Sequence, residues 1–222
     1  MVSARRAIEE AASAPAIETV ARYDEFLAFV RGRLAEKKIE HCLSVTRYLA
    51  SFAPDVGLAH EAAVTAGVLH DIARKLDNEE LLERARNYGI PVNRFQRQKP
   101  RLLHGPVAAE EARDVLGIDD PEVYDAIYWH TTGRPEYCRL GQALYLADFS
   151  EPLRTYPEAA EARTLLERQG FDTALVYVAR VKIGFLHRKA VMDPVSEDFY
   201  AWLRRTRMHT DTHGHTRTGE AG

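Results

Sequence analysis

The segment AHEAAVTAGVLHDIA, residues 59–73, decides the fold. It is rich in alanine and carries Val64, Val68 and Leu69 at helical spacing, which favours a helix packed by neighbours on several sides. Two charged residues, Arg74 and Lys75, follow it and mark its end. We therefore predict a buried helix over 59–73.

Apolar residues recur at helical spacing on both sides of this segment, first within 26–34 and 45–52. Asn78 is expected to cap the next helix, whereas residues 92–101 are basic, lack clear periodicity and are predicted to form a loop at the mouth of a site. The alternation typical of strands is absent. The sequence therefore predicts an all-α bundle, with further helices over 78–87, 105–116, from 121 onwards, 140–149, 158–169, 171–187 and 196–205.

The chain of 222 residues has room for one domain with a proper apolar core. We expect residues 1–20 to be an N-terminal extension and residues 21–206 to form this domain. Residues 207–222 are mostly Thr, His and Gly and have no apolar face. Such a segment buries too little surface to order itself, so we expect a disordered tail.

Composition and charge exclude several classes of protein. With 30 Lys and Arg against 33 Asp and Glu, the net charge of -3 gives no global positive field for nucleic acid. Glu9 and Glu10 interrupt the apolar core of any signal peptide, and Arg180 and Lys182 interrupt the most apolar later stretch. Two cysteines are too few for a disulfide framework. We therefore expect a cytoplasmic protein that binds neither nucleic acid nor membrane.

Six residues on or beside predicted helices form a candidate metal site. Imidazole nitrogens and carboxylate oxygens suit first-row metals such as iron, manganese or zinc, and a helical bundle can point them inward from several helices. A lone histidine at the start of a helix is more often a cap or a core residue, and a buried carboxylate needs a metal, an arginine or a cap role. The six residues are His41, His70, Asp71, His104, His130 and Asp148.

The adjacent pair His70 and Asp71 is the most informative part of this set. Neighbouring residues in a helix point about 100° apart, so both cannot follow one packing stripe. Their side chains can converge only on something that lies between them. A metal ion near the end of the helix over 59–73 meets this condition.

Longer motifs surround these residues. They read AGVLHDIAR at 66–74, LHGPV at 103–107, HTTGRP at 130–135, and ADFSEP at 147–152 followed by Arg154. In this order, with His41 before them, the sequence resembles the HD-domain phosphohydrolases over residues 24–203. More narrowly, it resembles the YqeK-type symmetrical bis(5'-nucleosyl)-tetraphosphatases of bacteria, because the last two motifs are far more specific than His-Asp.

The resemblance implies an HD-domain helical bundle and an enzyme that cuts diadenosine tetraphosphate and related dinucleoside polyphosphates in the middle, giving two ADP. It implies two metal ions bound by the six residues, commonly iron, with manganese or zinc as alternatives. Two ions about 3.5–4 Å apart can acidify a water molecule and screen phosphate charge. Asp71 is the candidate bridge, and Asp71, His104 and His130 are the candidate catalytic residues. A monomer or homodimer is expected.

A tetraphosphate is highly negative, so residues that bind phosphate oxygens should line the site. Arg74 and Lys75 could instead complement the negative end of the preceding helix, and Gly133 could be a simple turn residue. The basic residues of 94–101 are interpreted as a solvated surface outside the site. The candidates for substrate binding, the last of them by resemblance, are Arg74, Lys75, Thr132, Gly133, Arg134, Arg154 and Arg163.

Two other functions remain open. The same metal site could act on another phosphorylated nucleotide, such as a cyclic dinucleotide or a nucleoside triphosphate. A regulatory module could bind a nucleotide at a vestigial site without cutting it, although the intact set of six candidate ligands argues against this. Identification of the reaction products separates these functions.

Overall fold

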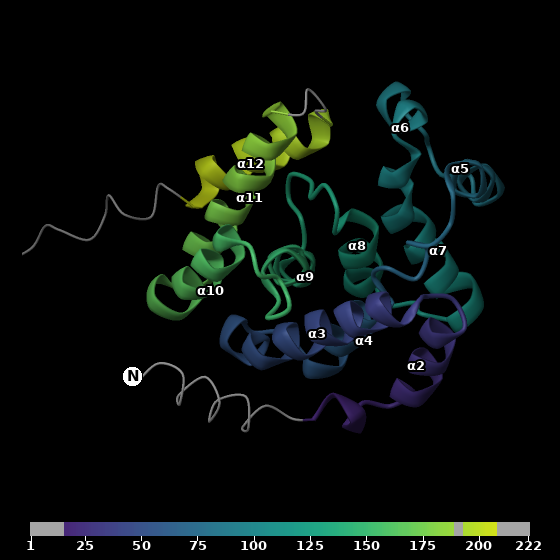
Figure 1. Ribbon diagram of the computed structural model, residues 1–222, viewed down its shortest axis with the longest axis horizontal. Helices are drawn as coiled ribbons and strands as arrows, with labels where there is room; N and C mark the ends of the chain where they lie inside the picture. Colours follow the sequence, from purple (N-terminus) through teal and green to yellow (C-terminus); the bar gives the residue numbers. More distant parts are fainter. Residues whose placement is uncertain (1–15, 189–192, 208–222) are drawn as a thin grey trace, which may run out of the picture.

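The computed structural model describes residues 16–188 and 193–207, and all regular structure in these ranges is helical (Figure 1). The all-α prediction is confirmed. In chain order the elements are η1 Ile17–Thr19, α2 Tyr23–Arg31, α3 Glu36–Phe52, η2 Pro54–Val56, α4 His60–Leu69, α5 Asn78–Asn87, α6 Arg94–Gln98, η3 Pro100–Leu103, α7 His104–Leu116, α8 Pro121–Trp129, α9 Arg139–Ser150, α10 Pro157–Gln169, α11 Phe171–Arg188 and α12 Pro194–Arg207.

Helices α3 and α4 pack against each other in the centre of the bundle. Every residue of α4 from Ala63 to Leu69 is buried, because its small side chains let neighbours approach from several sides. A Cβ atom at Gly67 would lie 2.8 Å from Thr46 Cα, so only glycine allows α3 to approach this closely. The close packing brings His41 of α3 next to the end of α4.

Helix α4 ends at Leu69, earlier than the predicted end at residue 73. His70 Nδ1 lies 2.8 Å from the carbonyl oxygen of Gly67 and satisfies an acceptor in the last turn. Residues 70–75 then form turns, in which the Arg74 backbone N–H donates to Asp71 O at 2.8 Å. The His-Asp pair therefore lies just beyond the helix C-terminus.

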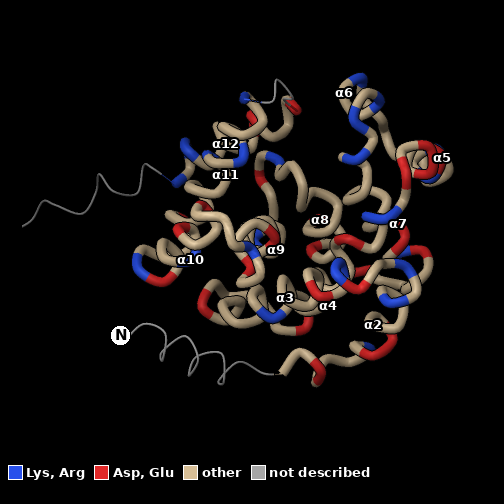
Figure 2. Tube along the Cα trace, in the orientation of Figure 1, with Lys and Arg blue, Asp and Glu red and all other residues tan. Residues whose placement is uncertain are grey.

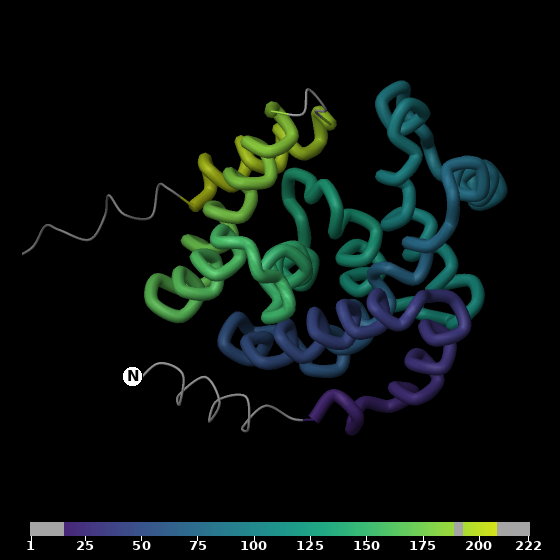
Figure 3. Tube along the Cα trace, in the orientation of Figure 1, coloured from purple at the N-terminus to yellow at the C-terminus, as the bar shows by residue number. Residues whose placement is uncertain are grey.

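Helix α9 is the other central helix of the bundle. Its residues 140–147 are buried, and it packs on α3, α4, α8, α10 and α11. Figure 3 shows the last part of the chain, α10 to α12 (green to yellow), stacked on one side of α9, whereas α5 to α7 lie on the other side. Side chains from distant parts of the sequence therefore meet around α9.

Residues 92–101 are not the loop that their composition suggests. They form α6 and the start of η3, and α6 begins with a capping box in which Asn93 and Gln96 each bind the other's backbone N–H. A five-residue helix is too short to show periodicity, which explains the wrong prediction. Helix α5 is capped by Asp77 and not by Asn78.

The expected extension and tail lie mostly outside the described residues. Ile17 and Val20, within the expected extension 1–20, are buried against the core. Arg207, the first residue of the expected tail 207–222, ends α12 and donates to Gln142 Oε1 at 3.0 Å. Residues 1–15 and 208–222 are outside the described part of the chain.

Most Lys, Arg, Asp and Glu residues of the described ranges are exposed or half-buried, and Figure 2 shows their positions on helices throughout the bundle. Glu111 is an exception, because it is buried and forms ion pairs with Arg33 and Arg84, which joins α7 to α5 and to the end of α2. Within 16–188 and 193–207, no helix combines the length and the apolar character that crossing a membrane requires.

Candidate metal centre

Four histidines meet in the middle of the bundle. His41 comes from α3, His70 follows α4, His104 begins α7 and His130 follows α8. The centroids of neighbouring rings lie between 4.8 and 5.6 Å apart, and the rings meet edge-on. All four side chains are buried, as is Asp71, whose carboxylate lies within 3.9 Å of three of the rings.

Hydrogen bonds select the same donor nitrogen in three of the four rings. Nδ1 of His70, His104 and His130 lies 2.8, 2.5 and 2.8 Å from a carbonyl oxygen three residues earlier. A carbonyl only accepts, so Nδ1 carries the proton and Nε2 keeps a free lone pair. Nδ1 of His41 lies 3.1 Å from Glu151 Oε1, which accepts in the same way. The Nε2 atoms of His70, His104 and His130 can therefore bind a cation, and so can that of His41 when its proton is on Nδ1 and faces Glu151.

The histidines and Asp71 form two donor groups. One group holds His41, His70 and Asp71, and the other holds Asp71, His104 and His130; within each group the ligand atoms lie within 4.8 Å of one another. Imidazole and carboxylate donors of this kind fit a divalent first-row metal ion. Because both groups contain Asp71, this carboxylate lies where a ligand shared by two ions would lie.

Some of the Nε2 atoms and the Asp71 carboxylate lie close together as acceptors, with no N–H donor between them. His70 Nε2 is buried and has no hydrogen-bond partner. His104 Nε2 lies 3.0 Å from His130 Nε2 and 3.2 Å from Asp71 Oδ1, so acceptor faces acceptor. Lone pairs at this distance repel each other unless a proton or a metal cation lies between them. The residues present therefore fit a positively charged metal ion.

Burial and charge set the protonation of the cluster. Burial lowers the pKa of His70 to about 4, so this ring is neutral at pH 7 and available as a ligand. Burial opposes ionisation of Asp71, but its electrostatic interaction with His70 and its contacts with His104 and His130 outweigh burial and hold the pKa of Asp71 well below its usual range. Asp71 is therefore an anion among imidazoles.

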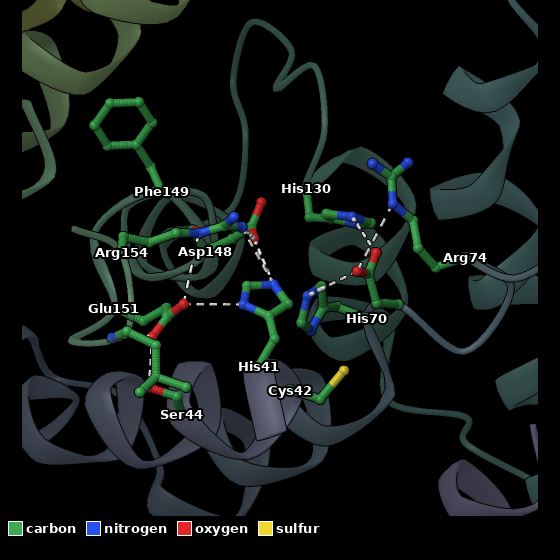
Figure 4. A network of polar contacts seen from close by, with 12 residues as sticks. His41, Cys42, Ser44, His70, Arg74, His130, Asp148, Phe149, Glu151 and Arg154 are labelled. Carbon is green, nitrogen blue, oxygen red and sulfur yellow. Dashed lines mark hydrogen bonds and ion pairs between the residues drawn. The ribbon is translucent and has the colours of Figure 1, made fainter. Parts of the chain in front are cut away.

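Asp148 of α9 lies beside His41 at the edge of the cluster (Figure 4). Its Oδ1 is 3.1 Å from His41 Nε2 and 3.1 Å from Arg154 Nη2. Asp148 is outside both donor groups, but a cation held by His41 Nε2 would have this carboxylate as a neighbour. Figure 4 also shows Arg154 and Arg74 on opposite sides of the histidines.

Glu151 supports His41 at the ring nitrogen that Asp148 does not face (Figure 4). Its buried carboxylate accepts from His41 Nδ1, from the Ser44 hydroxyl at 2.5 Å and from Leu153 N at 2.6 Å. A carboxylate behind a metal-binding imidazole fixes the ring orientation and raises the basicity of its other nitrogen. The sequence prediction missed Glu151, although it stands three residues after Asp148 in the ADFSEP motif, a spacing that places both on one side of a helix end.

A cavity of about 760 Å³ opens over the cluster, and Asp71, His104, His130 and Asp148 line it. This is the volume of a typical small-molecule site. Its two walls come from different parts of the chain and combine cations with aromatic and aliphatic residues. They include Arg74, Phe95, Lys99, Arg101 and Leu102 on the side of α6 and η3, and Phe149, Arg154, Tyr156, Val181, Lys182 and Phe185 on the side of α9 to α11; the carboxylates of Glu158 and Asp193 line the cavity as well.

Three of the predicted substrate-binding residues, Arg74, Thr132 and Arg154, line this cavity. Lys99 and Arg101 line it as well, which agrees with the predicted place of 92–101 at the mouth of a site but not with the interpretation of the basic residues of 94–101 as a surface outside it. The cause is η3, which leads directly from Lys99 into α7 and so holds this segment beside His104. No periodicity marked this arrangement in the sequence.

The other predicted substrate-binding residues lie elsewhere. Lys75 is exposed, and Gly133 forms a turn with φ +66 against the ring of Phe199. Arg134 Nε donates to Asp125 Oδ1 at 3.0 Å. Arg163, the remaining one, donates to Ser150 O at 2.8 Å and so satisfies a carbonyl at the end of α9. The structure does not bring these four residues to the cavity wall.

The HD-domain family model matches residues 39–167, the range that contains all six predicted metal ligands. The crystal structure of a predicted HD superfamily hydrolase involved in NAD metabolism, from Clostridium acetobutylicum, superposes on 85% of this chain with a TM-score of 0.80 and 30% sequence identity, and is itself covered completely. The chain belongs to the HD-domain family.

Two similar enzymes indicate the branch of the HD-domain family to which the chain belongs. The chain is 31% identical to the symmetrical bis(5'-nucleosyl)-tetraphosphatase of Bacillus subtilis (strain 168), over 81% of this chain and 96% of the relative. The enzyme of the same name from Staphylococcus aureus is 31% identical over 72% of this chain and 82% of its own length. Within the HD-domain family, the chain therefore falls in the branch of the symmetrical bis(5'-nucleosyl)-tetraphosphatases, as its motifs predicted.

Proposed function

We propose that this protein hydrolyses diadenosine tetraphosphate and related dinucleoside polyphosphates in the middle, giving two nucleoside diphosphates. The observation that carries the proposal is the pair of donor groups that share Asp71 at the cavity. Two adjacent metal ions suit the hydrolysis of a phosphate anhydride. Relatives that align with most of the chain are named for this reaction.

The six predicted ligands would hold two metal ions. His41, His70 and Asp148 would bind one ion, His104 and His130 the other, and Asp71 both. When bound, the ions neutralise phosphate charge and lower the pKa of a water molecule that attacks phosphorus. Iron is our first choice, with manganese or zinc as alternatives, since the ligand set suits all three.

The chain's own cations would orient the substrate. Arg74 and Arg154 lie on opposite sides of the histidines, so each can bind the phosphates of one half of the substrate (Figure 4). Cleavage in the middle requires that the two halves are held alike around the reacting phosphorus. Thr132 would add a hydroxyl contact at the same cavity.

The remaining predictions are part of the same proposal. Asp71, His104 and His130 are proposed as the catalytic residues, since their side chains line the cavity. Residues 21–206 are proposed as one HD phosphohydrolase domain, acting as a monomer or homodimer without nucleic acid. Both cysteines are free thiols, in keeping with a cytoplasmic location. Lys75, Gly133, Arg134 and Arg163 remain candidates for substrate binding, the last of them by resemblance.

Product analysis tests this function. The protein is purified without a histidine tag, supplied in turn with ferrous iron, manganese or zinc, and incubated with diadenosine tetraphosphate. We expect ADP as the single nucleotide product. Equal amounts of AMP and ATP would show asymmetric cleavage, and the absence of turnover with every metal would favour a module that binds nucleotides without cutting them.

A further inference from the structure

Lys182 is a charged residue on the buried face of α11. Val178 and Ala179, one turn earlier on this face, are fully buried. Lys182 lines the cavity from the wall opposite α6 and η3. It lies beyond residue 167, where the match to the HD domain ends, so the domain motifs do not include it.

The contacts of the Lys182 ammonium are unusual for a half-buried lysine. Nζ donates to the carbonyl oxygen of Thr131 at 3.0 Å and lies 3.6 Å from the centroid of the Tyr145 ring. Among the described residues it has no ion pair with a carboxylate, and the Thr131 carbonyl is its one hydrogen-bond acceptor, although an ammonium can donate three hydrogen bonds. Partial burial of a cation without an anion is unfavourable, and burial lowers the pKa of Lys182 to about 8. An anionic ligand would relieve this cost.

Lys182 is also close to the donor groups. Thr131, which accepts from Nζ through its carbonyl, places its own hydroxyl 3.2 Å from His104 Nε2 and 3.3 Å from His130 Nε2. By contrast, Arg154 on the same wall already pairs with Asp148 at 3.1 Å. Lys182 is therefore a cation on this wall that is still available to an anion beside the candidate metal centre.

We propose that Lys182 binds a phosphate group of the substrate, and that α11 thereby adds a phosphate-binding residue from outside the matched HD domain. This inference rests on the proposed function, because the ligand is the polyphosphate part of a dinucleoside polyphosphate. The alternative role is purely structural: the lysine would only hold the residue after His130 in place through the Thr131 carbonyl. Variants at this position separate the two roles.

Lys182→Met removes both the charge and the N–H donor, Lys182→Gln removes the charge but keeps a donor for the Thr131 carbonyl, and Lys182→Arg keeps the charge. The matched control is Arg180→Met, which removes a cation from the same helix at a position that does not line the cavity. Calorimetry then measures binding of inorganic tripolyphosphate to full-length protein of equal metal content. Thermal unfolding of each variant verifies that it is folded.

We expect tripolyphosphate to bind about 10- to 100-fold more weakly to Lys182→Met and Lys182→Gln, the loss of one charge-assisted hydrogen bond. Lys182→Arg should stay within a few-fold of the parent, and Arg180→Met should match it. Equal affinity of all variants, a loss confined to Lys182→Met, or no binding to the parent protein would overturn the proposal.

The outcome is separable from that of the proposed function. If the parent protein binds tripolyphosphate through Lys182 but releases no ADP from diadenosine tetraphosphate, the hydrolysis proposal fails and the phosphate-binding role stands. If the parent protein releases ADP and the Lys182 variants bind tripolyphosphate normally, the phosphate-binding role of Lys182 fails and the hydrolysis proposal stands.

Discussion

Asp71 is the residue on which both donor groups depend. It is the one member that the two groups share, and its carboxylate faces His104 Nε2 at 3.2 Å and His130 Nε2 at 3.7 Å. The surrounding imidazoles keep it ionised despite its burial, so it can neutralise part of the charge of two cations at once. No other side chain in the described residues has this position.

Replacement of Asp71 tests this role. We expect Asp71→Ala to lose hydrolysis of diadenosine tetraphosphate by orders of magnitude and to lose bound metal, because neither ion would keep a complete ligand set. Helical content by circular dichroism should be unchanged. Asp55→Ala, at an exposed position of η2, is the matched control and should behave as the parent. Near-normal turnover of Asp71→Ala would reject the bridging role.

Glu151 acts through His41. We expect Glu151→Gln to weaken metal binding about 10- to 100-fold, because an amide holds the His41 Nδ1–H less strongly than a carboxylate does. Ser44→Ala, which removes the 2.5 Å hydrogen bond to Glu151, should give a smaller loss. The measurement is the metal retained against increasing chelator, with the exposed Glu161→Gln as control. Equal retention in all four proteins would mean that Glu151 has no part in the centre.

At the scale of elements, the close approach of α3 and α4 positions His41 and His70. A Cβ at Gly67 would lie 2.8 Å from Thr46 Cα, so Gly67→Ala must push the two helices apart. We expect the free energy of unfolding to fall by about 1–3 kcal/mol, as for other overpacked cores, and metal affinity to fall with it. Urea denaturation measures the change.

Gly32→Ala is the control for this substitution. The nearest atom to an added Cβ at Gly32 lies at 3.5 Å, and its φ of -68 suits any residue. Its stability should therefore stay within about 1 kcal/mol of the parent. If Gly67→Ala were as stable as Gly32→Ala, the distance between α3 and α4 would not matter for the site.

The sequence predicted the helices well where a helix buries one face, because the period of apolar residues is a local property. The prediction was wrong where side-chain hydrogen bonds, and not apolar periodicity, determine the ends of a helix. Residues 94–98 form a helix through the Asn93 and Gln96 capping box without an apolar stripe, and α4 ends at Leu69 because His70 turns back onto the Gly67 carbonyl. Both outcomes depend on side-chain hydrogen bonds that the periodicity does not contain.

At the scale of the whole molecule, the motifs predicted which histidines and aspartates matter, because those residues lie in longer and more specific stretches. The motifs did not predict which other side chains contact these residues. Glu151 meets His41 across 110 residues of chain, and Lys182 meets Thr131 across 51. Composition does not tell which of the many cations line the cavity. Arg163, for example, only satisfies a carbonyl at a helix end, and this follows from the three-dimensional arrangement.

The cavity itself is a property of the whole chain. Its two walls come from α6 and η3 on one side and α9 to α11 on the other, and Figure 2 shows basic segments on both sides. The donor groups lie between these walls. This arrangement suits a substrate with two similar halves joined by phosphates.

Anomalous diffraction from crystals of the manganese-loaded protein tests the central claim most directly. We predict two anomalous peaks, one in contact with His41, His70 and Asp148 and the other with His104 and His130, both bound by the carboxylate of Asp71. A single peak, or peaks that Asp71 does not touch, would contradict the account.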